Sequence, residues 1–177
     1  DRNLYPPTHP YHWQIIGSLE DLDGAAIQDV HAFYYSWYSP NNATLVVAGD
    51  FDSAETKRWI EKYFSEISSR SLPPTTEVPP VGLGKTKRLF HEDKLVRVPT
   101  LTMSWPTVEK YHEDAYPLEL LARLLAEGKR SLLFKLIVDE ERLAPSVDAF
   151  TDEAELAGKF NIWVRGFEGV DLNRIYR

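Results

Sequence analysis

A proline-rich stretch divides the chain and limits how its two sides can be arranged. Residues 71–84 have the sequence SLPPTTEVPPVGLG, with four prolines and two glycines. Proline fixes φ and has no N–H to donate, so this stretch favours an extended connector over a helix or an inner strand. We therefore predict two structured parts, residues 1–70 and residues 85–177, joined by the connector.

The first part has alternating helix and strand patterns. Apolar residues recur at three- and four-residue spacing over residues 24–38, which predicts a helix. Residues 43–49 form a short, apolar, β-branched run, as is typical of a central strand covered on both faces. Asp52, with Glu55 three residues later, has the pattern of a cap at the start of a second helix. Residues 1–23 are expected to be loop with one short turn.

The second part predicts a layered α+β fold. Its short alternating runs indicate strands, and its longer runs with apolar residues at three- and four-residue spacing indicate helices. We expect, in order, strands at 87–91 and 98–105, a helix at 113–127 followed by Gly128, a second helix capped by Ser131, strands at 146–150 and 160–165, and the start of a helix near residue 171. Such an order implies an antiparallel sheet with helices packed on one face.

Composition excludes several classes of function. The 177 residues are 43% hydrophobic and 27% charged, which is typical of a folded domain with a real core. A net charge of −7 argues against non-specific nucleic-acid binding and against binding to an anionic membrane surface. There is no cysteine, so disulfides, thiolate zinc sites and cysteine nucleophiles are excluded. No apolar run is long enough to predict a membrane-spanning segment.

Two further features concern the origin of the chain. It begins without Met, at Asp1, and ends in a helix-like pattern near Arg177, which is what we expect of a piece of a longer protein. The lack of cysteine is compatible with export, and the interpretation leans towards the bacterial periplasm or another extracytoplasmic location.

Histidine patterns give little support for a metal site within the chain. His9 and His12 are three residues apart, but Pro10 lies between them in an expected loop, and no third ligand is evident nearby. The alternative is a polar loop packed by Tyr11 and Trp13.

Other candidate motifs are incomplete. The His-Glu pairs at residues 91–92 and 112–113 begin like the zinc motif H-E-x-x-H, but Leu95 and Tyr116 stand where its second histidine belongs. Residues 82–86 lack the first glycine of a phosphate-binding loop. We therefore predict no catalytic residue and no metal ligand in this chain.

Three blocks of sequence, in order, resemble the pitrilysin/insulinase family of zinc metallopeptidases. They are HPYHWQIIGSLEDL at residues 9–22, FYYSWYSPNNATLVVAGDFD at 33–52, and LLARLLAEGKRSLLFKLIVDEERLAPSVDAF at 120–150. The middle block is the most specific, and together the three extend over most of the chain.

The resemblance implies a fold of repeated αβ domains, with residues 1–70 ending one domain and residues 85–177 beginning the next. It also implies that the zinc ligands, an inverted H-x-x-E-H helix and a downstream glutamate, precede the block at residues 9–22. No zinc is therefore expected in this chain, although zinc is expected in the parent protein.

The family also carries an arginine and, seven residues later, a tyrosine, in a context like L-R-x-x-x-G-L-A-Y-S-V, which reach the substrate carbonyl. The resemblance places Val138 at the arginine position and Pro145 at the tyrosine position, while Arg142 is four residues away. Neither side chain can donate a hydrogen bond to an oxyanion. The substrate-binding residues therefore stay unknown.

Two interpretations follow. The chain is a non-catalytic segment of a zinc-dependent endopeptidase or oligopeptidase, contributing chamber wall and interdomain packing, with a peptide or protein substrate and the other domains of the same chain as partners. Alternatively, it belongs to a catalytically inactive partner subunit or peptide-binding module of the same family. An unrelated α+β binding domain is a third possibility.

Overall fold

The computed structural model describes residues 1–75, 77–78 and 80–177, and it divides into two compact units. Unit 1 consists of Asp1–Trp13 together with Glu77–Arg177, and unit 2 is Gln14–Thr76. Residues 1–13 thus group with the chain that follows the connector. Two positions of the connector, residues 76 and 79, lie outside the described residues. The division into two αβ domains at 1–70 and 85–177 remains a prediction.

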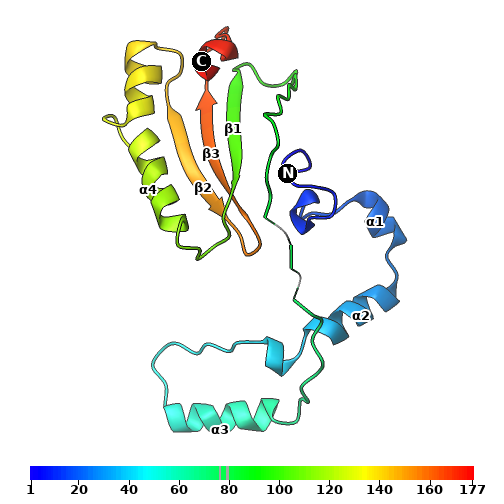
Figure 1. The fold of residues 1–177 in the computed structure, drawn as a ribbon. Helices are drawn as coiled ribbons and strands as arrows, with labels where there is room; N and C mark the ends of the chain where they lie inside the picture. The colour runs from blue at the N-terminus through cyan, green and yellow to red at the C-terminus, as the bar shows by residue number, and fades with distance from the viewer. Residues whose placement is uncertain (76, 79) are drawn as a thin grey trace. The chain divides into compact units, whose positions relative to one another are not determined.

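Unit 1 is built on a three-stranded antiparallel sheet. Its strands are β1 (Thr100–Thr107), β2 (Val147–Glu153) and β3 (Gly158–Arg165), in the spatial order β1-β3-β2 (Figure 1). Central strand β3 pairs with both neighbours, so that Val164 lies opposite Leu101 on β1 and Val147 on β2. The α+β class and the antiparallel pairing expected from the sequence are confirmed.

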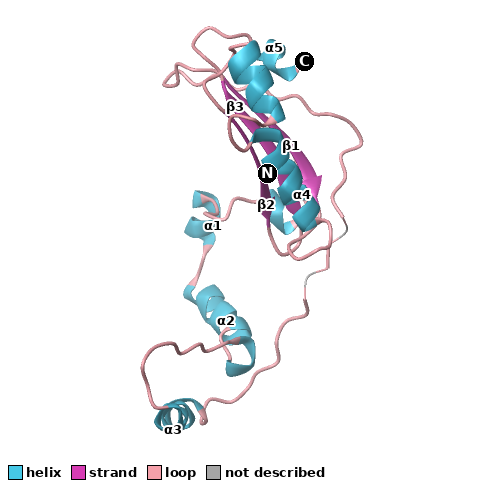
Figure 2. Ribbon diagram, turned by 90° about the vertical axis from the view of Figure 1, so that its left-hand side faces the viewer, coloured by secondary structure: helices cyan, strands magenta, loops and turns pink. Residues whose placement is uncertain are grey.

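The core of unit 1 lies on one face of this sheet. Helix α4 (Ala115–Ala126) runs along β2 on that face (Figures 1 and 2) and buries Ala122 and Ala126. Val164 and Ala144 are fully buried. The short C-terminal helix α5 (Leu172–Tyr176) adds Ile175. The alternation of apolar and polar residues in each strand places one set of side chains towards α4 and the other on the open face.

The end of α4 follows the sequence prediction. Glu127 donates its N–H to the carbonyl of Arg123, and Gly128 follows with φ of 79°. This left-handed conformation is unfavourable for residues with a Cβ, and glycine adopts it freely. Gly128 is therefore the predicted residue that stops the helix.

The prediction of a strand at residues 87–91 is wrong. Among the described residues this segment has no partner in a sheet, although it lies in unit 1. Its contacts come instead from long side chains: Lys87 Nζ donates to the carbonyl of Asn3 at 2.7 Å, and the guanidinium of Arg88 lies 4.5 Å from the ring centroid of Tyr176. An alternating pattern alone does not supply a neighbouring edge for the backbone to bind.

Unit 2 is helical. It contains α1 (Leu19–Gly24), α2 (Ile27–Trp37) and α3 (Ser53–Phe64). The sequence interpretation missed α1 and treated it as loop; its signal was Ser18, which accepts the N–H of Asp21, followed by acidic residues in the first turn. The predicted cap of α3 is confirmed, since Asp52 accepts the N–H of Glu55 at 2.7 Å.

The strand expected at residues 43–49 is not formed. The structure gives this run no regular secondary structure, and within the described residues no other strand pairs with it. Val46 in its middle is 80% exposed. A strand requires hydrogen-bonding partners on a neighbouring strand, so the apolar pattern is present here without the sheet that would use it.

Arg70 holds the end of α2 and the turn that follows. Its backbone N–H donates to Ser39 Oγ at 3.1 Å and to Asn41 Oδ1 at 3.2 Å, while Asn41 Nδ2 donates to the carbonyl of Arg70. Its guanidinium donates to the carbonyl of Tyr38 and lies 4.7 Å from the ring centroid of Tyr35. A cation at a helix C-terminus binds the carbonyls left free there and interacts favourably with the helix dipole.

Most large apolar side chains of unit 2 are uncovered. No residue of α2 or α3 is buried, although both helices are rich in aromatic residues. The half or more exposed aromatic and aliphatic side chains on α2, on the 43–49 run and on α3 are Ile27, Val30, Phe33, Tyr34, Tyr35, Leu45, Val46, Trp59, Tyr63 and Phe64.

Candidate functional site

Residues 132–147, called the 132–147 segment below, are the part of the chain that resembles a substrate-binding element. The segment begins after a tight turn in which Ser131, a buried residue, donates its Oγ–H to the carbonyl of Gly128 at 2.8 Å. The prediction that Ser131 caps the next helix is therefore wrong. Its hydroxyl closes the turn from α4 instead of accepting an N–H of the following helix.

The helix expected after Ser131 is present, but most of it is a π-helix, whose turns are wider than those of the predicted α-helix. Residues Phe134–Glu140 form a π-helix, in which the N–H of Glu141 binds the carbonyl of Leu136, five residues earlier, at 2.9 Å. The N–H of Leu143 then binds the carbonyl of Ile137 at 2.9 Å. Ile137 and Leu143 are both buried in the core of unit 1, so the wider turn keeps both apolar side chains on the covered side. π-helical turns are rare and are frequently found at functional sites.

The turn into β2 places a strained residue at Arg142. Its φ is 52°, in the left-handed region that residues with a Cβ rarely occupy. The family pattern described above, L-R-x-x-x-G-L-A-Y-S-V, carries its glycine at this position. The pattern thus has glycine, the residue best suited to a left-handed backbone, where this chain has Arg142.

The two residues at the arginine and tyrosine positions lie in different surroundings. Val138 is half-buried on the π-helix, and Pro145 is exposed just before β2. Between them, Leu143 and Ala144 are buried in the core. Neither Val138 nor Pro145 has a side-chain donor, and the absence of a binding role for them stays a prediction.

The charged side chains at the end of the π-helix are solvated and do not form a catalytic group. Asp139 and Glu140 are exposed, and Glu141 binds Arg174 of α5 at 3.1 Å, with about half of each side chain exposed. Exposed ion pairs of this kind contribute about 0–1 kcal/mol. The acidic cluster at residues 139–141 is therefore a solvated helix end.

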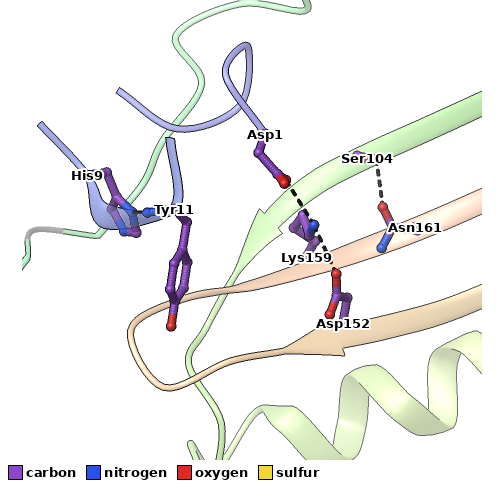
Figure 3. Close-up of polar contacts among 7 residues, drawn as sticks. All are labelled: Asp1, His9, Tyr11, Ser104, Asp152, Lys159 and Asn161. Atoms are coloured by element: carbon purple, nitrogen blue, oxygen red, sulfur yellow. Dashed lines mark hydrogen bonds and ion pairs between the residues drawn. The ribbon is translucent and has the colours of Figure 1, made fainter. Parts of the chain in front are cut away.

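His9 and His12 do not form a pair suited to metal binding. His9 is 2% exposed and stacks on Tyr5, with ring centroids 4.7 Å apart (Figure 3 shows its place beside Tyr11). Its Nδ1 accepts the N–H of Tyr11 at 3.0 Å, while His12 Nδ1 lies 2.8 Å from the carbonyl oxygen of Tyr5. Each imidazole thus has one nitrogen engaged in a hydrogen bond to the backbone.

Among the described residues, none of the other histidines belongs to a group of side chains that could hold a metal ion. His112 Nδ1 accepts the N–H of Asp114 at 3.1 Å, and His91 is exposed. Within residues 1–75, 77–78 and 80–177, no group of three or more histidine, aspartate or glutamate side chains is placed to hold a metal ion. In the same part of the chain, no helix is long and apolar enough to cross a membrane.

The burial of His9 was not predicted from the sequence. Its only signal was the run His9-Pro10-Tyr11, because a histidine two residues before a tyrosine N–H can accept from it in a tight turn. Nothing in the sequence around Arg70 indicated that this residue would bind the end of α2 and the turn that follows it.

Comparison with known proteins identifies relatives among zinc proteases. Residues 25–167 match the model of the family described as the peptidase M16 inactive domain. The chain is 30% identical over 151 residues to the zinc protease PqqE of Helicobacter pylori, covering 84% of this chain and 33% of that protein. It is 27% identical over 161 residues to an uncharacterized zinc protease of Mycobacterium leprae, covering 84% of this chain and 35% of that protein. The chain thus spans about a third of the length of these relatives.

Solved structures share the fold. A protease from Helicobacter pylori superposes with a TM-score of 0.74 at 25% identity, covering 95% of this chain and 41% of that one. A peptidase M16 inactive domain from Pseudomonas fluorescens superposes with a TM-score of 0.70 at 15% identity, covering 93% and 39%. The solved structures show the shared fold, and the family-model match over residues 25–167 confirms the family resemblance drawn from the sequence.

We predict that replacing Arg142 by glycine stabilises unit 1. Left-handed backbone costs a residue with a Cβ about 1–2 kcal/mol, and glycine removes this strain at some cost in unfolded-state entropy, so the expected gain is about 0.5–1 kcal/mol. Chemical denaturation of the 1–177 chain, followed by the combined fluorescence of its five tryptophans, measures the change in the free energy of unfolding. Arg142→Ala is the matched control, because it removes the same side chain and keeps the Cβ. An equal gain from both variants would show that the side chain, and not the backbone, is responsible.

Proposed function

The chain belongs to the peptidase M16 family, in the region whose model is described as the inactive domain, and from this premise we propose that it is a non-catalytic segment of a longer zinc-dependent peptidase. In this proposal the zinc ligands lie outside the 177 residues, upstream of them. The segment contributes wall and packing surface to a chamber in which a peptide is cleaved.

Two findings support a zinc peptidase as the parent protein. Relatives that the chain matches are named zinc proteases, and the chain spans only about a third of their length. Peptide hydrolysis by such an enzyme needs a metal-bound water and a general base. The described residues offer no group that could hold the metal, so the chemistry is assigned to other parts of the parent.

One observation carries the non-catalytic assignment. The 132–147 segment has a left-handed residue, Arg142, where the family's substrate-binding pattern carries glycine, and it has no side-chain donor at the pattern's two key positions, Val138 and Pro145. A tetrahedral oxyanion needs hydrogen-bond donors at about 2.7–3.1 Å. Leu143 and Ala144, between these positions, serve the core instead. The segment is therefore structural in this proposal.

The packing role is supported by unit 2. Its apolar side chains on α2, on the 43–49 run and on α3 are exposed in numbers that a stable isolated unit does not carry. Each square ångström of apolar surface removed from water contributes about 25 cal/mol. We propose that other segments of the parent protein cover these side chains, with residues 43–49 forming a strand of an αβ domain that residues 1–70 complete.

The first test uses the parent protein. We expect it to hydrolyse peptides in a zinc-dependent manner, with activity lost to a chelator and restored by zinc. Val138→Ala and Pro145→Ala should change kcat/KM by less than about threefold, since loss of an oxyanion donor costs about 100–1000-fold. A hundredfold loss in either variant would contradict the structural role of the segment. A parent without zinc-dependent hydrolysis would support the inactive-partner alternative instead.

The second test concerns the uncovered run. Val46→Asp is expected to leave the stability of the 1–177 chain within about 0.5 kcal/mol, because Val46 is 80% exposed there. In the parent protein the same substitution is expected to lower the free energy of unfolding by about 3 kcal/mol, since a charge would then be buried without a partner. Thermal and chemical denaturation of both proteins measure this difference.

Lys57→Glu is the control for this pair, because Lys57 lies on the exposed polar side of α3. Its effect should be small in both proteins. An equally small effect of Val46→Asp in the parent would show that nothing covers residues 43–49 there.

A further inference from the structure

We propose that residues 1–13 form a pH-sensitive strap, which binds the turn between β2 and β3 while His9 is neutral and leaves it when His9 takes up a proton. The strap is the N-terminal part of unit 1, and its ligand is the end of the sheet on which it lies. This behaviour of the strap goes beyond the peptidase role proposed above and does not depend on it.

The strap is held to the sheet end by a few polar contacts. Tyr11 Oη accepts the N–H of Leu156, in the turn between β2 and β3, at 3.0 Å. Lys159 Nζ, on β3, lies 3.1 Å from a carboxylate oxygen of Asp1 and 2.9 Å from one of Asp152 on β2 (Figure 3). These contacts are few, and most of them lie near solvent, so the buried ring beside them has a large influence on whether the strap stays bound.

His9 is the buried centre of the strap. Its ring stacks on Tyr5 with centroids 4.7 Å apart and is tilted against Tyr11 with centroids 5.1 Å apart. Nδ1 accepts the N–H of Tyr11, so the neutral ring carries its proton on Nε2. Nε2 is buried and has no hydrogen-bond partner in the described part of the chain.

Protonation is incompatible with this arrangement. An imidazolium donates from both nitrogens, so Nδ1 would lose its role as acceptor of the Tyr11 N–H, and two N–H groups would then face each other. The charge would also be buried between two phenol rings with no carboxylate bound to either nitrogen. Attraction of the cation to the stacked Tyr5 ring offsets only part of these losses.

The direction of the pH effect follows from burial. Desolvation lowers the pKa of His9 below its ordinary value of 6.5. A group whose pKa is lower in the bound strap than in the free strap favours binding at high pH. Binding is therefore complete above pH 6.5 and weakens by up to about tenfold per pH unit as the pH falls from 6.5 towards the lowered pKa.

Other charged and titratable groups lie near the strap. Lys159 forms ion pairs with Asp1 and with Asp152 at the end of the sheet. Burial raises the pKa of Tyr5 above its usual value of 10.0, so its hydroxyl stays neutral. His12 is also part of the strap, and its Nδ1 lies 2.8 Å from the carbonyl oxygen of Tyr5.

The experiment measures hydrogen exchange in the 1–177 chain by NMR between pH 7.5 and pH 5. Protection factors, corrected for intrinsic exchange, are taken for the Leu156 and Tyr11 amides, with amides of β3 as internal reference. We expect the first two to fall at least fivefold between pH 6.5 and pH 5 while the β3 amides change less than twofold.

Two variants identify the residue responsible. His9→Asn keeps an acceptor oxygen near the position of Nδ1 and cannot be protonated, so the pH dependence of both amides should disappear. His112→Asn is the matched control, because His112 Nδ1 also accepts the N–H two residues ahead but is partly exposed. This variant should keep the wild-type response. A wild-type response that persists in His9→Asn would overturn the proposal.

If the strap of the His9→Asn variant fails to bind the sheet end already at pH 7.5, a direct titration of the wild-type chain decides the test. The ring proton signals of His9 in the wild-type chain are then followed over the same pH range. We expect them to titrate below pH 6.5, together with the loss of Leu156 protection. Titration at or above pH 6.5, or titration with Leu156 still protected, would also overturn the proposal.

Discussion

Pairing of β3 with strands on both sides is the interaction on which the rest of unit 1 depends. Val164 on β3 is fully buried and lies opposite Leu101 on one neighbour and Val147 on the other. A slip by one residue would turn Val164 away from the core and bring Trp163 or Arg165 towards it, so the register is fixed by burial. Beyond the sheet, the N–H of Phe167 binds the carbonyl of Leu143, which holds the 132–147 segment at the end of β3.

That constraint also positions the 132–147 segment, which we propose to be structural. Ile137, Leu143 and Ala144 are buried against the sheet, and the π-helix and the left-handed Arg142 are the backbone arrangements that put them there. The positions left over for function, Val138 and Pro145, carry no donor. The segment thus packs against the sheet and has no side-chain donor at the two positions where the family pattern carries arginine and tyrosine.

Sequence reasoning succeeded where local patterns decide the structure. The alternation around Leu101, the cap at Asp52 and the stop at Gly128 are each determined by a few neighbouring residues. It failed where a distant partner decides. Residues 43–49 have the pattern of a strand but no neighbour among the described residues, and the 87–91 run is held by side chains instead of a ladder. For the candidate site, the family pattern located Val138 and Pro145. The π-helix at Phe134–Glu140 and the stacking of His9 on Tyr5 were not predicted, because they depend on tertiary packing that no local pattern encodes.

We propose that the chemistry of the parent peptidase depends on residues outside this chain. The decisive experiment is metal analysis of the purified 1–177 chain after dialysis against micromolar zinc, combined with a peptide-hydrolysis assay of the same sample. We expect zinc well below one equivalent per chain and no hydrolysis above the blank. One tightly bound zinc per chain, or hydrolysis that a chelator abolishes, would contradict it.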